Sequence, residues 1–218
     1  MLDIIRTLSL AMILTAFVTV ESRSLRRALT AYMAQALLMV AVIAGFATIH
    51  PALAIWAVTA FVTKFGLISW VLWREIRKGS DEEVAPRVGP LASAIIVGVL
   101  AVAGYRFVHA NVAFLAPTPT AEMEPFRTNV AVSLTLLAIG IYAIVTRRDA
   151  LKVVLGVCLM ENGAHLSLVS LATTMHETVL IGIVTDVVVA VVLLLYFIRA
   201  IAERLGTRDS SQLALLKG

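Results

Sequence analysis

The chain has 218 residues, of which 60% are hydrophobic and 15% charged, with a formal net charge of +4 and a mean hydropathy of +0.95. Soluble domains usually have roughly 45–50% apolar and about 25% charged residues, so this balance excludes an ordinary water-soluble fold. The single cysteine, Cys158, excludes an internal disulfide, and the sequence has no Cys/His cluster spaced for zinc, iron–sulfur or haem. We therefore expect an all-α protein that crosses the membrane several times and carries no cofactor of its own.

Long apolar runs predict seven transmembrane helices, because each run can cross a hydrocarbon core of about 30 Å at about 1.5 Å per residue. The charge-free stretch from Ala28 to Thr63 is too long for one helix, and His50 and Pro51 provide a turn within it. The predicted helices are residues 2–20, 28–49, 51–73, 89–108, 128–146, 150–175 and 178–201. We divide the chain into a four-helix membrane region, residues 1–127, and a three-helix region with a tail, residues 128–218.

Basic residues are distributed unevenly between the two sides of this helix map. One side holds Arg23, Arg26, Arg27, Arg74, Arg77, Lys78, Arg87, Arg147, Arg148, Lys152, Arg199, Arg204, Arg208 and Lys217. The positive-inside rule therefore predicts an external N-terminus and a cytoplasmic C-terminus. Because these charges flank membrane helices, they do not indicate a nucleic-acid partner. The acidic residues Asp81, Glu82 and Glu83 fall in a cytoplasmic loop and are expected to be solvated.

Three ionisable residues fall inside predicted helices: Lys64 in the third, Glu161 in the sixth and Asp186 in the seventh. Each costs at least about 2.5–3.5 kcal/mol at a lipid-exposed helix centre, so all three should face protein or water. One interpretation is structural, with Lys64 neutralising a carboxylate and fixing the helix packing. The other is a proton relay, in which burial and a neighbouring cation act in opposite directions on a carboxyl group.

The predicted turn between the last two helices limits how the two carboxylates communicate. Counted from it, Glu161 lies about 20 Å deep and Asp186 about 12 Å, which excludes a direct hydrogen bond between them. A bridging group is then needed, and His165, one turn from Glu161 on the same helix face, is the nearest candidate. A packed histidine with no relay role remains the alternative.

Two glycines and the cysteine of the sixth helix have simpler interpretations. Gly156 and Gly163 are two turns apart on one face, which predicts close approach of a neighbouring helix. Cys158 is expected to be a small buried hydrophobic residue.

The segment Gly156–Leu166, Gly-Val-Cys-Leu-Met-Glu-Asn-Gly-Ala-His-Leu, resembles the hydrogenase-4 component E family. Proteins of this family are membrane subunits of formate hydrogenlyase and related group 4 nickel–iron hydrogenase complexes. The resemblance continues through Ile181–Asp186 and the tail at Gly206–Asp209, and it includes Phe61–Lys64 in the amino half.

From about residue 128 onward, the chain also looks like the K subunit of bacterial complex I and the C subunit of Mrp-type antiporters. In that wider family two helices each carry a membrane-embedded carboxylate of the proton path. Glu161 matches the first position, and Asp186 falls at the second, where the complex I chain has glutamate. This second resemblance does not cover the first four helices, so it implies nothing for Lys64.

These resemblances imply a non-catalytic, multi-pass subunit of a bacterial or archaeal cell membrane, part of a hydrogenase-type oxidoreductase complex. Glu161 and Asp186, together with Lys64 and the bridging candidate His165, are the expected proton-relay residues. The nickel–iron site and iron–sulfur clusters would lie in partner subunits, which include antiporter-like and quinone-site-like membrane chains and a peripheral hydrogenase arm. Two alternatives remain: a subunit of a multi-chain cation/proton antiporter, and a structural scaffold in a related dehydrogenase complex.

Overall fold

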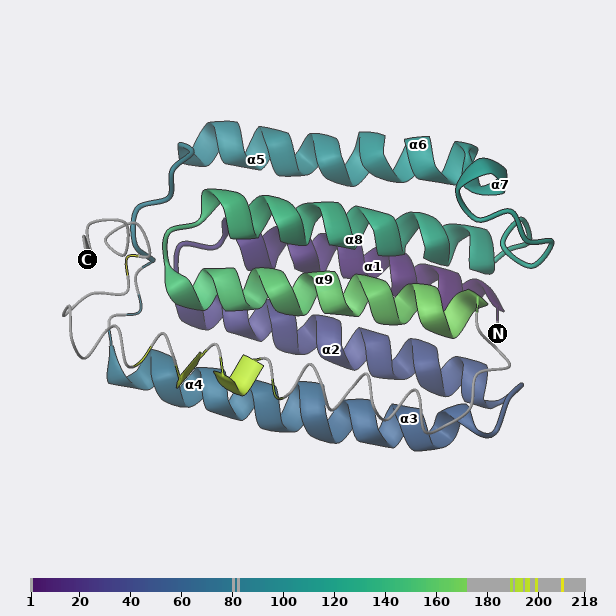
Figure 1. Ribbon diagram of the computed structural model, residues 1–218, viewed down its shortest axis with the longest axis horizontal. Coiled ribbons are helices and arrows are strands. Elements are labelled where there is room, and N and C mark those ends of the chain that lie inside the picture. Colours follow the sequence, from purple (N-terminus) through teal and green to yellow (C-terminus); the bar gives the residue numbers. More distant parts are fainter. Residues whose placement is uncertain are drawn as a thin grey trace.

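The computed structural model describes residues 2–79, 81, 83–171, 189, 191–193, 195, 196, 199 and 209. Within these ranges long helices lie side by side along one axis, and no β-strand is present (Figure 1). An isolated β-bridge joins Asp149 to Asp209. The predicted all-α class is confirmed.

The helices follow one another with short connections over most of the described chain. They are α1 (Leu2–Glu21), α2 (Leu25–Ala47), α3 (Leu53–Ala60), η1 (Phe61–Ile68), α4 (Ser69–Lys78), α5 (Pro90–Val99), η2 (Leu100–Gly104), α6 (Tyr105–Ala110), α7 (Val112–Leu115), α8 (Phe126–Thr146) and α9 (Ala150–Leu171). The elements η1 and η2 are π-helical, and each continues the α-helices on either side of it.

Six of these helices or continuous helix runs are long and apolar enough to cross a membrane, and they match the first six predicted spans within a few residues. The third, Leu53–Lys78, extends beyond the predicted end at residue 73. Its last turns are amphipathic, with Arg74 over the ring of Trp70 and Arg77 over that of Trp73. The described residues within 178–201 are helical, whereas Asp186 lies outside the described residues.

The helices are arranged around α9. Only 17% of the α5–α6 span is buried, against 67% of the α9 span, so α9 is central and α5–α6 peripheral. Helix α9 packs along α8 and contacts α1 and α2, while α3, η1 and α4 cover the far side of α2. In Figure 1 the α5–α6 span and the α3–α4 span form the two outer edges of the bundle.

Glycines bring the backbones of α8 and α9 into contact, as the sequence predicts for Gly156 and Gly163. A Cβ atom on Gly163 would lie 2.6 Å from the Ser133 carbonyl oxygen. A Cβ atom on Gly140 would lie 2.7 Å from the Gly156 carbonyl oxygen. No side chain separates the two helices at these points, so α8 and α9 form a closely packed pair.

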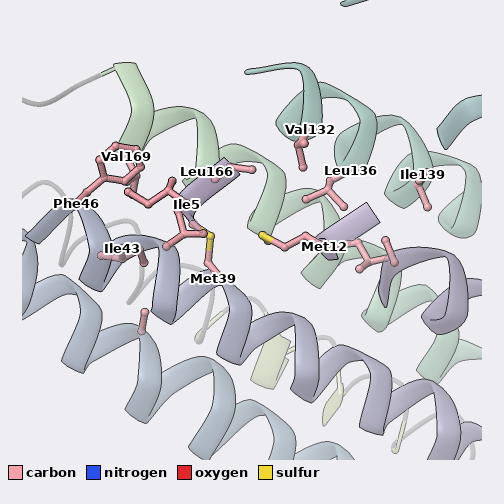
Figure 2. Packing of buried hydrophobic residues seen from close by; sticks show 14 of the residues in the cluster. Ile5, Met12, Met39, Ile43, Phe46, Val132, Leu136, Ile139, Leu166 and Val169 are labelled. Carbon is pink, nitrogen blue, oxygen red and sulfur yellow. The ribbon is translucent and has the colours of Figure 1, made fainter. Parts of the chain in front are cut away.

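Of the three apolar clusters in the described part of the chain, the two larger ones have polar side chains between them. The larger cluster includes Ile5, Met12, Met39, Phe46, Leu166 and Val169 (Figure 2). The smaller cluster includes Leu25, Leu29, Tyr32, Leu72, Leu155 and Cys158. On the buried face of α2, Gln35 and Ala36 lie between Tyr32 and Met39, and in the third span Lys64 lies between Ala60 and Ile68. We call Gln35, Lys64, Glu161 and Asn162 the polar layer.

The acidic residues of the loop between α4 and α5 are not simply solvated. The partly buried Asp81 accepts hydrogen bonds from the Ser24 hydroxyl at 2.8 Å and the Arg26 backbone N–H at 2.9 Å, at the start of α2. Although partial burial alone would raise it, these hydrogen bonds and the charges of Arg26 and Arg27 lower the pKa of Asp81. Asp81 thus anchors the loop to the N-terminus of a helix, where a carboxylate is favourable.

The prediction that Glu83 is solvated is wrong. Its side chain is only 3% exposed, and its oxygens lie 3.4 Å from Arg147 Nη1 and 3.9 Å from Lys152 Nζ. Burial raises the pKa of Glu83, against the opposing effect of Lys152 and Arg147. Arg147 Nη2 also lies 2.6 Å from Glu21 Oε1 at the end of α1. The buried Arg147 guanidinium therefore connects α1, the loop that carries Glu83, and the connection between α8 and α9.

Candidate functional site

A buried ion pair links the third span to α9. The Lys64 Nζ atom lies 2.7 Å from Glu161 Oε1 and donates a hydrogen bond to Asn162 Oδ1 at 2.8 Å. The side chains of Lys64 and Glu161 are 1% and 7% exposed. At about 1.5 Å per residue, Lys64 is about 21 Å from the end of α4 and Glu161 about 16 Å from the start of α9. The pair therefore lies near the middle of both spans.

Lys64 is presented to α9 from a π-helical segment. In η1 the backbone hydrogen bonds span five residues, so the turn is wider than in an α-helix and the side chains after it are rotated. The buried residues of η1 are Lys64 and Ile68, and the Ser69 hydroxyl donates a hydrogen bond to the Lys64 carbonyl oxygen at 3.1 Å. That hydroxyl satisfies a backbone carbonyl next to the irregularity, and π-helical turns of this kind often occur at functional sites.

His165 contacts the same carboxylate oxygen as Lys64. Its Nδ1 atom lies 3.1 Å from Glu161 Oε1, one helical turn away as the sequence predicts. The ring is fully buried, and it packs edge-on against the indole of Trp56 with 5.4 Å between the ring centroids. The histidine contact lacks hydrogen-bond geometry, so it is a close approach of two groups that can each carry a proton.

Several polar atoms of this site have no hydrogen-bond partner in the part of the chain that the structure describes. They include Glu161 Oε2, Asn162 Nδ2 and His165 Nε2, all buried. The Lys64 ammonium and the His165 imidazole thus both lie against one carboxylate oxygen, Glu161 Oε1. The second oxygen, Oε2, is available to another hydrogen-bond donor. Chemically, such a cluster can take up or release one proton with little movement of its heavy atoms.

Among the predicted site residues, the structure brings together Lys64, Glu161 and His165. Asp186 lies outside the described residues, so its distance from the other three stays a prediction. The sequence analysis missed Gln35 and Tyr32, which are fully buried on α2 in and next to the polar layer. The available signal was an amide, Gln35, within the charge-free stretch from residue 28 to residue 63.

Over the described residues, no group of three or more His, Cys, Asp or Glu side chains converges to hold a metal ion. Within the site, Glu161 and His165 are two residues of these types that contact each other.

The fold and the ion pair define a multi-pass α-helical membrane protein with ionisable groups in mid-membrane. A family model described as NADH-ubiquinone/plastoquinone oxidoreductase chain 4L matches residues 129–218. Over its whole length the chain is similar to "Hydrogenase-4 component E" of Escherichia coli (strain K12) and of Shigella flexneri. Each relative is 32% identical over 222 residues, covering 99% of this chain and 98% of the relative. The chain belongs to the hydrogenase-4 component E family.

A shorter relative covers the C-terminal part. The NADH-quinone oxidoreductase subunit K of Deinococcus radiodurans is 34% identical over 101 residues, which cover 44% of this chain and 98% of that protein. No solved structure matches the chain. Both resemblances expected from the sequence, to the hydrogenase-4 component E family and to the complex I K subunit, are confirmed.

Proposed function

We propose that this chain is a non-catalytic membrane subunit of a complex I-related hydrogenase and takes part in proton translocation coupled to redox turnover. The full-length similarity to hydrogenase-4 component E supports the hydrogenase context, and the match over residues 129–218 supports the relation to complex I. In this proposal Glu161, Lys64, His165 and Asp186 handle the proton. The nickel–iron site and iron–sulfur clusters belong to partner subunits.

The observation that carries the proposal is the ion pair between Lys64 and Glu161 in mid-membrane. Lys64 comes from the amino half, and Glu161 comes from the segment that resembles complex I. The pair therefore joins the two regions that we propose, residues 1–127 and 128–218. A buried ion pair is weak evidence for stability, because well-packed apolar residues often stabilise such a position equally well. That favours a role in chemistry for these charges.

The contacts suggest how the residues act together. While Glu161 is ionised, its charge holds the Lys64 ammonium at 2.7 Å. Once Glu161 accepts a proton, that attraction is lost and Lys64 retains only its hydrogen bond to Asn162. Conversely, any change of charge elsewhere in the complex that draws Lys64 away favours protonation of Glu161. Protonation of the carboxyl and position of the ammonium are thus coupled.

The test is Glu161→Gln in the complete complex, reconstituted in sealed vesicles. We expect normal assembly and electron transfer, with a large loss of protons moved per electron pair. The matched control is Glu122→Gln, which neutralises an exposed carboxylate outside the membrane spans. Full proton translocation by an assembled Glu161→Gln complex would contradict the proposal.

The same preparation separates the alternatives. A structural scaffold predicts that Lys64→Met combined with Glu161→Gln leaves proton translocation unchanged. If the chain is a subunit of a cation/proton antiporter, it should co-purify in mild detergent with other membrane chains but without nickel–iron and iron–sulfur subunits.

A further inference from the structure

Helix α2 contributes an unpaired amide to the polar layer. The Gln35 side chain is fully buried, and neither its Nε2 nor its Oε1 atom has a hydrogen-bond partner among the residues that the structure describes. One turn away on the same face, the hydroxyl of the fully buried Tyr32 is also without a hydrogen bond in that part of the chain. Neither residue has a role in the proton relay proposed above.

Gln35 lies at the same depth in the bundle as Glu161. The loop of residues 79–89 bonds to the starts of both α2 and α9, through Leu25 N–H to Asp81 O and Val84 N–H to Asp149 Oδ2, so the two helices start at one end. From that end Gln35 is about 15 Å deep and Glu161 about 16 Å at the helical rise. Helix α2 contacts both α9 and η1, and Tyr32 packs in the smaller apolar cluster together with Cys158, which lies three residues before Glu161 on α9.

The unpaired atoms of this region complement one another chemically. Asn162 Nδ2 and Gln35 Nε2 can only donate, Glu161 Oε2 and Gln35 Oε1 accept, and the Tyr32 hydroxyl can do either. Leaving a buried polar group unsatisfied costs about 1–3 kcal/mol, whereas a buried water typically makes about three hydrogen bonds to such groups. The larger and the smaller apolar cluster lie on either side of the polar layer along the bundle. Any water held here is therefore confined to the polar layer.

We propose that Gln35 and Tyr32 hold ordered water against Glu161 and Asn162, and that Gln35 is a positioning residue for proton exchange at Glu161. The water binds to the amide of Gln35, the hydroxyl of Tyr32 and Glu161 Oε2. Lys64 contacts the other carboxylate oxygen, Oε1. Water at this place gives Glu161 a proton donor and acceptor that does not disturb the ion pair. The second half of this inference rests on the proposed function, whereas the water site does not.

The water site can be tested by hydroxyl-radical labelling of the complete complex, in which X-rays split water and label the residues beside it. We expect rapid labelling of Tyr32 in spite of its full burial. Gln35→Leu should lower the labelling of Tyr32 several-fold. The matched control is Met39→Leu, one turn further along the same face but inside the larger apolar cluster, which should leave the labelling of Tyr32 unchanged. A Tyr32 that is not labelled, or is labelled equally in Gln35→Leu, overturns the inference.

The positioning role is tested by proton translocation in the same variants. Gln35→Leu should transfer electrons normally but move fewer protons per electron pair, whereas Met39→Leu should match the parent complex. If Glu161→Gln translocates protons normally while Tyr32 labelling still depends on Gln35, the water site stands and the proposed function falls. If Glu161→Gln abolishes translocation but Gln35→Leu changes neither labelling nor translocation, this inference alone is wrong.

Discussion

Replacing Lys64 by methionine removes the cation of the buried pair while keeping a side chain of similar length. The variant leaves the Glu161 carboxylate buried, with the His165 ring as its remaining contact. At the observed separation of 2.7 Å, the attraction is about 6 kcal/mol for an effective dielectric constant of about 20. Part of that attraction only offsets the cost of taking both charges out of water, so the net loss is smaller. We expect Lys64→Met to lower the free energy of unfolding by about 3–5 kcal/mol.

A double-mutant cycle isolates the interaction from other effects of the substitution. Glu161→Gln alone should cost less than Lys64→Met, because the Lys64 ammonium keeps its hydrogen bond to Asn162. The combination of Lys64→Met with Glu161→Gln should be nearly as stable as the parent chain, since no unpaired charge remains. The expected coupling energy is about 2 kcal/mol or more.

The measurement is unfolding of the purified chain in mixed micelles, titrated with sodium dodecyl sulfate and followed by far-ultraviolet circular dichroism. If the effects of the two single substitutions add to within about 0.5 kcal/mol in the double variant, the two charges do not interact and the reasoning is refuted.

Two further predictions concern the packing of α8 on α9 and the start of α2. Gly163→Ala should cost about 1–3 kcal/mol of unfolding free energy, because its Cβ would lie 2.6 Å from the Ser133 carbonyl oxygen. The control is Gly98→Ala, where a Cβ meets nothing within 4 Å, and equal effects of the two substitutions would argue against close backbone packing. Because the pKa of Asp81 is lowered, its carboxylate stabilises the start of α2 fully when the pH is above the ordinary pKa of 3.8. This stabilisation disappears as the pH falls through the lowered pKa. Asp81→Asn should therefore speed amide exchange at Leu25 and Arg26 at neutral pH but not in strong acid, and a difference that persists in strong acid would contradict the assigned cause.

Much of the fold could be predicted because hydropathy and charge placement act directly on membrane helices. The first six spans follow from long apolar runs, and the turn at residues 48–52 follows from His50 and Pro51. Lys64 and Glu161 stand out because a charge within an apolar run is costly, and the spacing of His165 from Glu161 predicts their contact.

Other features depend on tertiary contacts that leave no local pattern. Beyond its first turn helix α2 is mostly apolar on every face, so no amphipathic stripe shows that Gln35 faces the interior. Nothing in the residues of η1 distinguishes a π-helix from an α-helix. Glu83 lies in a polar loop, and its burial follows only once Arg147 and Lys152 are brought beside it by the packing of other helices.

The glycine contacts between α8 and α9 determine which half of the ion pair has freedom to move. Glu161 is carried by a helix whose backbone touches that of its neighbour at Gly140, Gly156 and Gly163, so sliding or tilting of α9 would bring main-chain atoms into collision. Lys64 comes from the outer α3–α4 span, at the π-helical segment η1, and its side chain reaches inward to Glu161 and Asn162. In any cycle that separates the two charges, we therefore expect the Glu161 carboxylate to stay in place and the Lys64 side chain to move.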